Sequence, residues 1–149
     1  MDDLTARLWK SLSGRVQWRL AFLRQATFMI GVTGVVRDAD GRVLLLRHRL
    51  WPDGRQWGLP SGYAERGETF EDTVVREVRE ETALEVRTGR LVRLTSGYRL
   101  RAEVAFEAEL VGGTLRVDRR EILEAGWFEP GALPADLMPS HRSLIAGAP

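Results

Sequence analysis

The chain has 149 residues, a length typical of one domain with a substantial buried core. Its formal net charge of +1 gives no overall attraction to nucleic acid, and 29% charged residues with 44% hydrophobic residues are typical of a globular protein. The absence of cysteine excludes disulfides, thiolate catalysis and cysteine-bound zinc. The start does not resemble a signal peptide and no apolar run approaches ~20 residues, so a cytoplasmic location is expected.

Residues 1–26 are predicted to form a helical extension before a main domain at 27–149. Ser13-Gly14 is expected to divide this extension into two shorter helices. We interpret the extension as helices packed on the domain or on a partner subunit in a homodimer, with a membrane-surface helix as the alternative. The positions expected to be buried are Leu4, Leu8, Leu12, Leu20, Phe22 and Leu23.

Two strands joined by a tight turn are predicted next. Residues 27–36 are apolar and rich in β-branched side chains, which is typical of a buried strand. Asp40-Gly41 is a hairpin turn signal, and residues 42–48 return as the second strand. Pro52-Asp53-Gly54 then predicts a loop.

A loop from Gly62 to Gly67 leads into a predicted helix. Thr69 is a suitable N-cap, and acidic residues in the first turn favour the positive end of the helix. The expected buried stripe is Phe70, Val74, Val75 and Val78.

The same helix carries three carboxylates on one side. Glu77, Glu80 and Glu81 fall within an arc of about 100°, so they repel one another unless a cation lies among them. Mg²⁺ prefers such oxygen ligands and is commonly shared with substrate phosphates. The alternative is a solvated helix face on which Arg76 and Arg79 balance the charge.

Strands dominate the rest of the chain. Residues 85–95 and 101–110 alternate apolar and polar side chains, and Gly112-Gly113 is predicted to turn the chain into a strand at 114–117. A charged loop at 118–124 precedes a short strand at 125–128. The further predictions are a loop at 130–139 and a short helix at 140–146.

The segment 62–84 resembles the Nudix box, G-x5-E-x7-R-E-U-x-E-E-x-G-U, in which U is aliphatic. Ala83 is the one departure, because the family usually has a glycine there that eases the turn out of the helix. Trp57–Ser61 is similar to the family's lead-in W-x-L-P-G-G, with Ser61 in place of the first glycine of the pair, and Trp127-Phe128 to its closing pair. The matching box residues are Gly62, Glu68, Arg76, Glu77, Val78, Glu80, Glu81 and Leu84.

This resemblance to the Nudix (MutT-like) hydrolases covers about residues 27–130. It implies the α/β/α sandwich of that family, with a mixed sheet, to which the N-terminal helical extension is added. It also implies hydrolysis within the pyrophosphate of a nucleoside diphosphate that is linked to another group. A bound divalent ion would neutralise that anionic substrate and lower the pKa of its bound water.

The resemblance implies a role for each box residue. Glu77, Glu80 and Glu81 are expected to bind Mg²⁺, or Mn²⁺ in its place, and one of them to serve as general base. The backbone carbonyl of Gly62 often joins the metal ligands in this family. Glu68 and Arg76 are expected to form an ion pair that orients the loop against the helix.

A further glutamate from a later loop often acts as base or ligand in the family. Glu121 is the first candidate here, and the alternatives are Glu124, Glu107 and Glu103. For each of them taken singly, an exposed charge without a role is the competing interpretation. His48 and His141 are expected to be ordinary surface or core residues, not catalytic groups.

Substrate contacts are predicted outside the box. Arg47, Arg49 and Arg55 lie on the side where a phosphate tail would pass. Aromatic rings suited to stacking on a base are those of Tyr98, Trp51 and Trp57, although Trp57 would equally suit the core.

The predicted substrate is a small nucleoside diphosphate derivative or nucleoside triphosphate, with no evident nucleic-acid or membrane partner. The SQPWPFPxS array typical of NADH diphosphatases is absent after the box, and Leu84 to Pro130 lacks the proline associated with ADP-ribose hydrolases. Two alternatives stay open: a non-catalytic nucleotide-binding sensor and an RNA 5′-end pyrophosphohydrolase.

Overall fold

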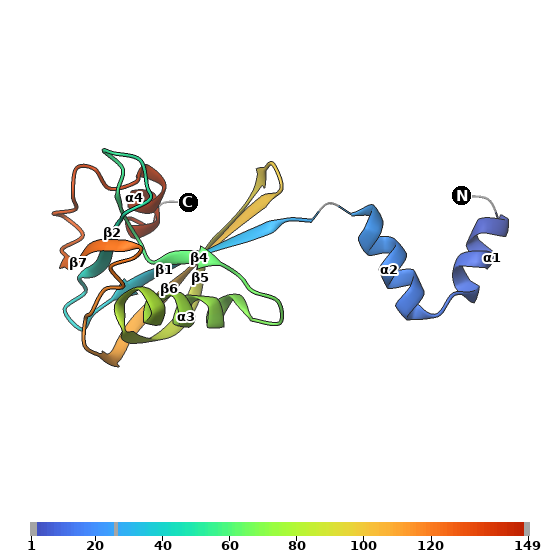
Figure 1. Cartoon of the computed structure of the whole chain (residues 1–149), viewed down its shortest axis with the longest axis horizontal. Coiled ribbons are helices and arrows are strands. Elements are labelled where there is room, and N and C mark those ends of the chain that lie inside the picture. Colours follow the sequence, from blue (N-terminus) through green and yellow to red (C-terminus); the bar gives the residue numbers. More distant parts are fainter. Residues whose placement is uncertain (1–2, 26, 148–149) are drawn as a thin grey trace.

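A computed structural model describes residues 3–25 and 27–147 of the chain. Within these residues seven strands form one mixed sheet (Figure 1). The strands are β1 (Met29–Arg37), β2 (Val43–His48), β3 (Trp57–Gly58), β4 (Ser61–Tyr63), β5 (Leu84–Tyr98), β6 (Arg101–Gly113) and β7 (Ile122–Phe128). The helices are α1 (Asp3–Ser11), α2 (Gly14–Arg24), α3 (Phe70–Thr82) and α4 (Pro139–Ile145).

Strand β1 is the centre of the sheet. It runs parallel to β6 along its whole length, from the Met29–Arg101 pair to the Arg37–Glu109 pair. On its other side it pairs antiparallel with β4 over its first half and with β2 at its end. Strand β2 continues the sheet to β3 and β7, and β5 forms the other edge beside β6.

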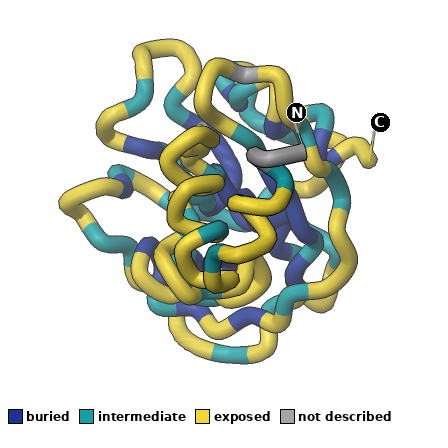
Figure 2. The backbone as a smooth tube through the Cα atoms, turned by 90° about the vertical axis from the view of Figure 1, so that its right-hand side faces the viewer, coloured by how far each residue is buried: buried dark blue, intermediate teal, exposed yellow. Residues whose placement is uncertain are grey.

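The alternation of side chains along β1 divides the core between the two faces of the sheet. Val32 and Val36 pack under α3 with Val74 and Val78, in one buried cluster. Val35 lies in a second cluster, which contains Leu144 and Ile145 of α4. Buried positions concentrate in the middle of this body (Figure 2). The expected α/β/α sandwich is therefore confirmed.

Helices α1 and α2 are divided before Gly14, as predicted, but their packing differs from the prediction. They stand away from the sheet in Figure 1, and α3 and α4 pack on its two faces. Leu12 is half-buried, whereas the exposed fractions of the other predicted core positions are 67% for Leu8, 41% for Leu20, 54% for Phe22 and 78% for Leu23. The side chain of Leu4 falls outside the described residues. Packing of the extension on its own domain is thus a wrong prediction.

Within residues 3–25 and 27–147, no helix combines the length and the apolar character that a membrane crossing requires.

Two further local predictions need correction. Gly112 and Gly113 stay in β6, opposite Glu85 and Leu84, and the next four residues do not form a strand. The N–H groups of Arg116 and Asp118 instead donate to the carbonyls of Thr82 and Glu81, at 2.8 and 3.0 Å. The last carbonyls of a helix lack partners within it, so these bonds draw the segment onto the end of α3.

The ends of the predicted elements shift accordingly. Strand β7 begins at Ile122, so the charged loop before it is shorter than predicted. On α3, Val74 and Val78 are buried as expected and Val75 is half-buried, whereas Phe70 is 38% exposed. Phe70 is the first residue of α3 and does not belong to the core cluster beneath the helix.

Ala83 ends α3 in the left-handed region, with φ 58° and ψ 17°. Its N–H donates to the carbonyl of Arg79 at 2.9 Å, which closes the helix. A residue with a Cβ atom is strained in this conformation, and glycine is not. The sequence departs from the Nudix box at the residue where the backbone requires a left-handed turn.

We therefore expect Ala83→Gly to raise the free energy of unfolding by about 1 kcal/mol. Urea denaturation of the purified chain measures this. Ala146→Gly is the matched control, because Ala146 ends α4 in the right-handed region and gains nothing from glycine. Equal effects at the two positions would contradict the explanation.

Candidate active site

Three segments enclose an open cleft of about 790 Å³. The first is β4 with the start of the loop that follows it, the second is one face of α3, and the third is the turn at 118–121. Thr69 fixes the start of α3, because its hydroxyl accepts a hydrogen bond from the N–H of Asp72 at 3.1 Å. The lining residues include Gly62, Arg76, Glu77, Glu80, Glu81, Asp118, Arg120 and Glu121.

Arg76 is the cation at the centre of the helix face. Its Nε donates to Glu68 Oε1 at 2.9 Å, and its Nη2 donates to Glu68 Oε2 at 3.1 Å and to the carbonyl of Tyr63 at 3.0 Å. Its Nη1 donates to Glu77 Oε1 at 2.8 Å and to Glu80 Oε2 at 3.2 Å. The two hydrogen bonds from Arg76 lower the pKa of Glu68 to about 2, and they connect the loop that carries Glu68 to the helix.

Glu77 lies directly against β4. A Cβ atom on Gly62 would collide with the Glu77 carboxylate, so glycine at this position lets the carboxylate lie where it does against the strand. Burial raises the pKa of Glu77, although the hydrogen bond from Arg76 acts in the opposite direction.

Glu81 is 5% exposed and is the most deeply buried carboxylate of the cleft. Among the described residues its Oε2 has no hydrogen-bond partner. Burial first, and then the charge of Glu77, raises the pKa of Glu81 well above its usual value. A buried carboxylate oxygen without a partner is costly, so this atom needs either a proton or a cation.

His48 lies behind Glu81, with 3.9 Å between Nδ1 and Glu81 Oε1. Burial lowers the pKa of His48 to about 4, and the nearby His141 adds to this shift. At neutral pH this imidazole is therefore uncharged and does not neutralise Glu81.

The donor set of the cleft fits a hard divalent cation. It offers carboxylate oxygens from Glu77, Glu80 and Glu81, one of them unpartnered, and the Gly62 backbone beside them. In residues 3–25 and 27–147, no three acidic or histidine side chains are already gathered closely enough to hold an ion. Arg76 occupies oxygens of Glu77 and Glu80, so loading an ion requires these side chains to rearrange.

Of the four later glutamates named from the sequence, Glu121 lines this cleft. The N–H of Glu121 donates to the carbonyl of Asp118, and the N–H of Arg49 donates to the carbonyl of Glu121. These two hydrogen bonds hold the turn that carries Glu121. Glu124 lies opposite Arg47 in the β2–β7 pair, and Glu107 binds Arg90 at 2.8 Å on β6. Glu103 lines a different cavity, on the other face of the sheet.

The predicted substrate arginines do not line the cleft. The guanidinium of Arg47 donates to Gln56 Oε1, that of Arg49 donates to the carbonyl of Arg119 at 2.9 Å, and Arg55 is exposed on the loop before β3. The side chain of Tyr98 lies outside the described residues.

The two tryptophans named from the sequence have aromatic contacts of their own. Trp57 is buried against Phe128, with ring centroids 5.1 Å apart, so it belongs to the core. Trp51 stacks on His48 at 3.8 Å.

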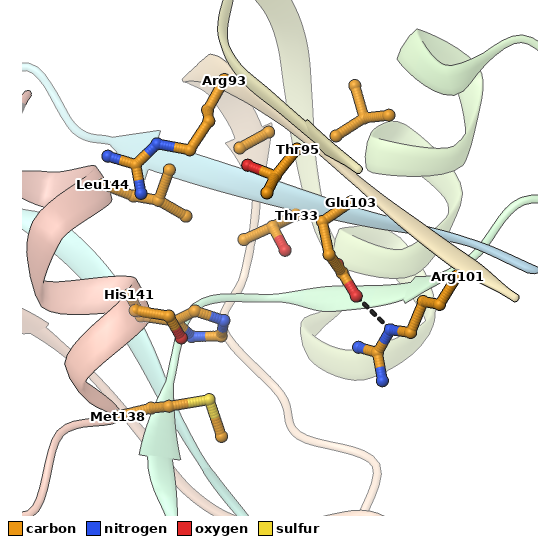
Figure 3. A pocket seen from close by; sticks show the side chains of 11 residues that line it. Thr33, Arg93, Thr95, Arg101, Glu103, Met138, His141 and Leu144 are labelled. Atoms are coloured by element: carbon orange, nitrogen blue, oxygen red, sulfur yellow. Dashed lines mark hydrogen bonds and ion pairs between the residues drawn. The ribbon is translucent and has the colours of Figure 1, made fainter. Parts of the chain in front are cut away.

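The sequence reasoning missed Arg120, which lines the cleft and binds Asp118 at 2.9 Å. It also missed a second cavity of about 250 Å³ between the sheet and α4 (Figure 3). The residues of this cavity come from four separate segments, so no local spacing reveals them. They are Thr33, Arg93, Thr95, Arg101, Glu103, Val104, Ala105, Met138, Ser140, His141 and Leu144.

Comparison with known proteins gives a family match. The family model described as NUDIX domain matches residues 27–147. A NAD-capped RNA hydrolase, NudC, of Erwinia tasmaniensis is 38% identical over 104 residues, which are 69% of this chain and 39% of that protein. The Pectobacterium carotovorum protein of the same name is 38% identical over 101 residues, 67% of this chain and 39% of that protein. The chain thus spans about two fifths of the length of these relatives.

Solved structures agree on the fold. A MutT NUDIX hydrolase from Burkholderia pseudomallei superposes with a TM-score of 0.67 at 25% identity, covering 81% of this chain and 98% of that one. A NUDIX hydrolase from Nitrosomonas europaea gives a TM-score of 0.72 at 23% identity, covering 82% of this chain and 70% of that one.

His141 makes the stability of this region pH-dependent. Its Nδ1 accepts a hydrogen bond from the N–H of Leu59 at 2.9 Å, and burial lowers its pKa from 6.5 to about 4. Below pH 6.5 His141 is protonated in the unfolded chain, whereas in the folded chain it stays neutral until about pH 4. The free energy of unfolding therefore falls as the pH drops from 6.5 to 4. From pH 7 to pH 5 we expect a loss of about 2 kcal/mol from this residue.

His141→Asn retains an acceptor for Leu59 and cannot titrate, so the loss between pH 7 and pH 5 should shrink by about 2 kcal/mol. Urea denaturation at a series of pH values measures it. Ser143→Ala, on the same helix, should retain the wild-type slope. An unchanged slope in His141→Asn would contradict the lowered pKa.

Proposed function

The chain belongs to the Nudix hydrolase family, and we propose that it is a divalent-metal-dependent pyrophosphohydrolase. Its proposed substrate is a small nucleoside diphosphate derivative or nucleoside triphosphate, cleaved within the diphosphate linkage. The observation that carries this proposal is the unpartnered, buried oxygen of Glu81, which lies beside Glu77 in an open cleft. An ion shared with substrate phosphates would satisfy this oxygen.

In this proposal Glu77, Glu80 and Glu81 bind the ion together with the carbonyl of Gly62. Mg²⁺ is the proposed ion, and Mn²⁺ has the same preference for oxygen ligands. Such an ion supplies charge neutralisation and a bound water of lowered pKa. The carboxylate of Glu121, on the turn across the cleft from α3, is the proposed acceptor of the proton of the attacking water.

Glu68 and Arg76 have a supporting role in the proposal. Arg76 binds the carbonyl of Tyr63 on the β4 side and three glutamates on the loop and α3, so it fixes the distance between the two walls of the cleft. When an ion takes the oxygens of Glu77 and Glu80, the two hydrogen bonds to Glu68 keep Arg76 in place.

An RNA 5′ end is the second candidate substrate. It is supported by 38% identity to proteins named NAD-capped RNA hydrolase, although the chain spans only 39% of their length. The missing SQPWPFPxS array and the net charge of +1 favour the small nucleotide instead.

A nucleotide panel tests the proposal directly. We expect hydrolysis of at least one nucleoside diphosphate derivative or triphosphate with Mg²⁺ or Mn²⁺, and a fall in kcat of about 100-fold or more in Glu80→Gln, Glu81→Gln and Glu121→Gln. Glu109→Gln is the matched control, because this exposed glutamate pairs only with exposed Arg87 in the part of the chain that the structure describes. The readout is phosphate or pyrophosphate release.

The same panel includes NAD-capped and triphosphorylated RNA. If only the RNA substrates are hydrolysed, RNA and not a small nucleotide would be the substrate. Binding of a nucleotide without any turnover would overturn the proposed activity in favour of a nucleotide sensor. Wild-type activity in Glu80→Gln and Glu81→Gln would contradict the assignment of the metal site to α3.

We further propose that the N-terminal helices pair with those of a second copy. Helix α2 exposes apolar side chains on two sides: Val16, Leu20 and Leu23 on one, and the stacked rings of Trp18 and Phe22, 5.5 Å apart, on another. A flat surface, such as a membrane, would cover only one of these two sides of α2. A bundle formed with the N-terminal helices of a second copy would cover both.

Deletion of residues 1–26 is expected to convert a homodimer into a monomer, because it removes this apolar surface. Light scattering coupled to size-exclusion chromatography measures the mass of each form. As a control, Trp18→Ala should weaken the dimer, whereas exchange of exposed Arg66 for Ala, in the loop after β4, should not. A monomeric full-length chain would rule this pairing out.

A further inference from the structure

The second cavity lies on the face of the sheet opposite α3, between β1, β5, β6 and the start of α4 (Figure 3). Its walls combine apolar side chains such as Leu144 and Met138 with hydroxyls such as Thr33 and Thr95. Glu103 is its one carboxylate among the described lining residues. In Figure 3 the Glu103 side chain points from β6 into the space between Thr33 and Arg101.

The backbone of β1 makes room for Glu103. Gly31 pairs with Glu103 across β1 and β6, and a Cβ atom on Gly31 would collide with the Glu103 carboxylate. Arg101 Nε binds Glu103 Oε1, and Thr95 is the residue opposite Glu103 on β5. The carboxylate therefore lies over a bare stretch of backbone, with a guanidinium beside it and 28% of the side chain exposed.

The two cavities open on opposite faces of the sheet, and the side chains of Tyr63 and Arg101 link them. Gly31 pairs with Glu103 on one side and with Tyr63 on the other, and Tyr63 lines the cleft of the α3 glutamates. The guanidinium of Arg101 lies 5.6 Å from the centre of the Tyr63 ring, so the side chains also join the two cavities. Because the cavities lie on opposite faces of the sheet, a nucleoside whose phosphates lie in the cleft would reach the second cavity by passing around the short strand β4 at Tyr63.

The chemistry of the second cavity differs from that of the first. A carboxylate repels phosphate, so the anionic part of a substrate belongs in the cleft, where an ion can neutralise it. An ionised carboxylate is an acceptor only, and it can accept two hydrogen bonds from adjacent donors. A nucleoside offers such a pair in two places: the cis-diol of its ribose, and the N1–H and amino group of guanine.

We propose that Glu103 is a specificity-determining residue that accepts hydrogen bonds from a pair of adjacent donors on the nucleoside part of the substrate. The proposal rests on the proposed function, since it takes the cleft as the place of the phosphates. Arg101 orients the carboxylate, and Gly31 gives it space. A ligand that lacks one donor of the pair leaves a desolvated carboxylate oxygen without a partner, which disfavours binding.

Calorimetric titration with GMP, IMP and 2′-deoxy-GMP tests this without any turnover. IMP lacks the guanine amino group and deoxy-GMP lacks the 2′-hydroxyl, so each removes one member of one donor pair. We expect wild type to bind GMP about ten-fold more tightly than one of the other two, and the nucleotide that is disfavoured identifies the pair. In Glu103→Gln the preference should fall below about two-fold.

Glu107→Gln is the matched control, because Glu107 lies on the same strand with an arginine partner of its own, Arg90, outside this cavity. It should retain the wild-type preference. Equal affinity of wild type for all three nucleotides, or a preference that survives in Glu103→Gln, would overturn the proposal. If Glu103→Gln does not fold, Glu103→Asp gives the same comparison with the carboxylate displaced.

The two proposals fail in different ways. A Glu103-dependent preference without hydrolysis of any nucleotide would support this inference and overturn the proposed activity. Hydrolysis with a preference that ignores Glu103 would do the reverse.

Discussion

The site depends on the hydrogen bonds of one guanidinium. Arg76 bonds to Glu68, Glu77, Glu80 and the carbonyl of Tyr63, and so it joins the helix, the loop and the strand that enclose the cleft. Glu77, Glu80 and Glu81 lie so close together on α3 that they would repel one another without a cation. Arg76 neutralises part of this charge but does not reach the buried oxygen of Glu81. The cleft is therefore acidic, and a divalent ion would neutralise its remaining negative charge.

The second constraint is the close approach of backbone to side chain at two glycines. Gly62 lets the Glu77 carboxylate lie against β4, and Gly31 lets the Glu103 carboxylate lie against β1. Because these residues belong to neighbouring strands, carboxylates on opposite faces of the sheet stand within a few strand spacings of each other. Such an arrangement suits a ligand whose phosphates and nucleoside need different surroundings.

Much of this site could be predicted from the sequence, because its central part is local. Spacing along one helix places Glu77, Glu80 and Glu81 on one side, whatever the rest of the fold does. Where the structure differs from what the sequence suggested, the difference concerns position in space. Arg47 and Arg49 follow the turn after β1 along the chain, but their guanidinium groups bind Gln56 and the carbonyl of Arg119 outside the cleft. Periodicity suggested buried leucines in residues 1–26, yet both faces of the sheet are already covered.

The sequence by itself determined the family and the capped acidic helix, since each follows from residues a few positions apart, whereas the left-handed conformation of Ala83 came from the structure. Only the tertiary structure decided that Glu121, and not Glu103, Glu107 or Glu124, shares the cleft with α3. It alone also showed the cavity around Glu103, whose walls come from β1, β5, β6 and α4. The physical reason is that helical spacing is fixed by the backbone, whereas contacts between distant segments depend on which strands pair and in which register.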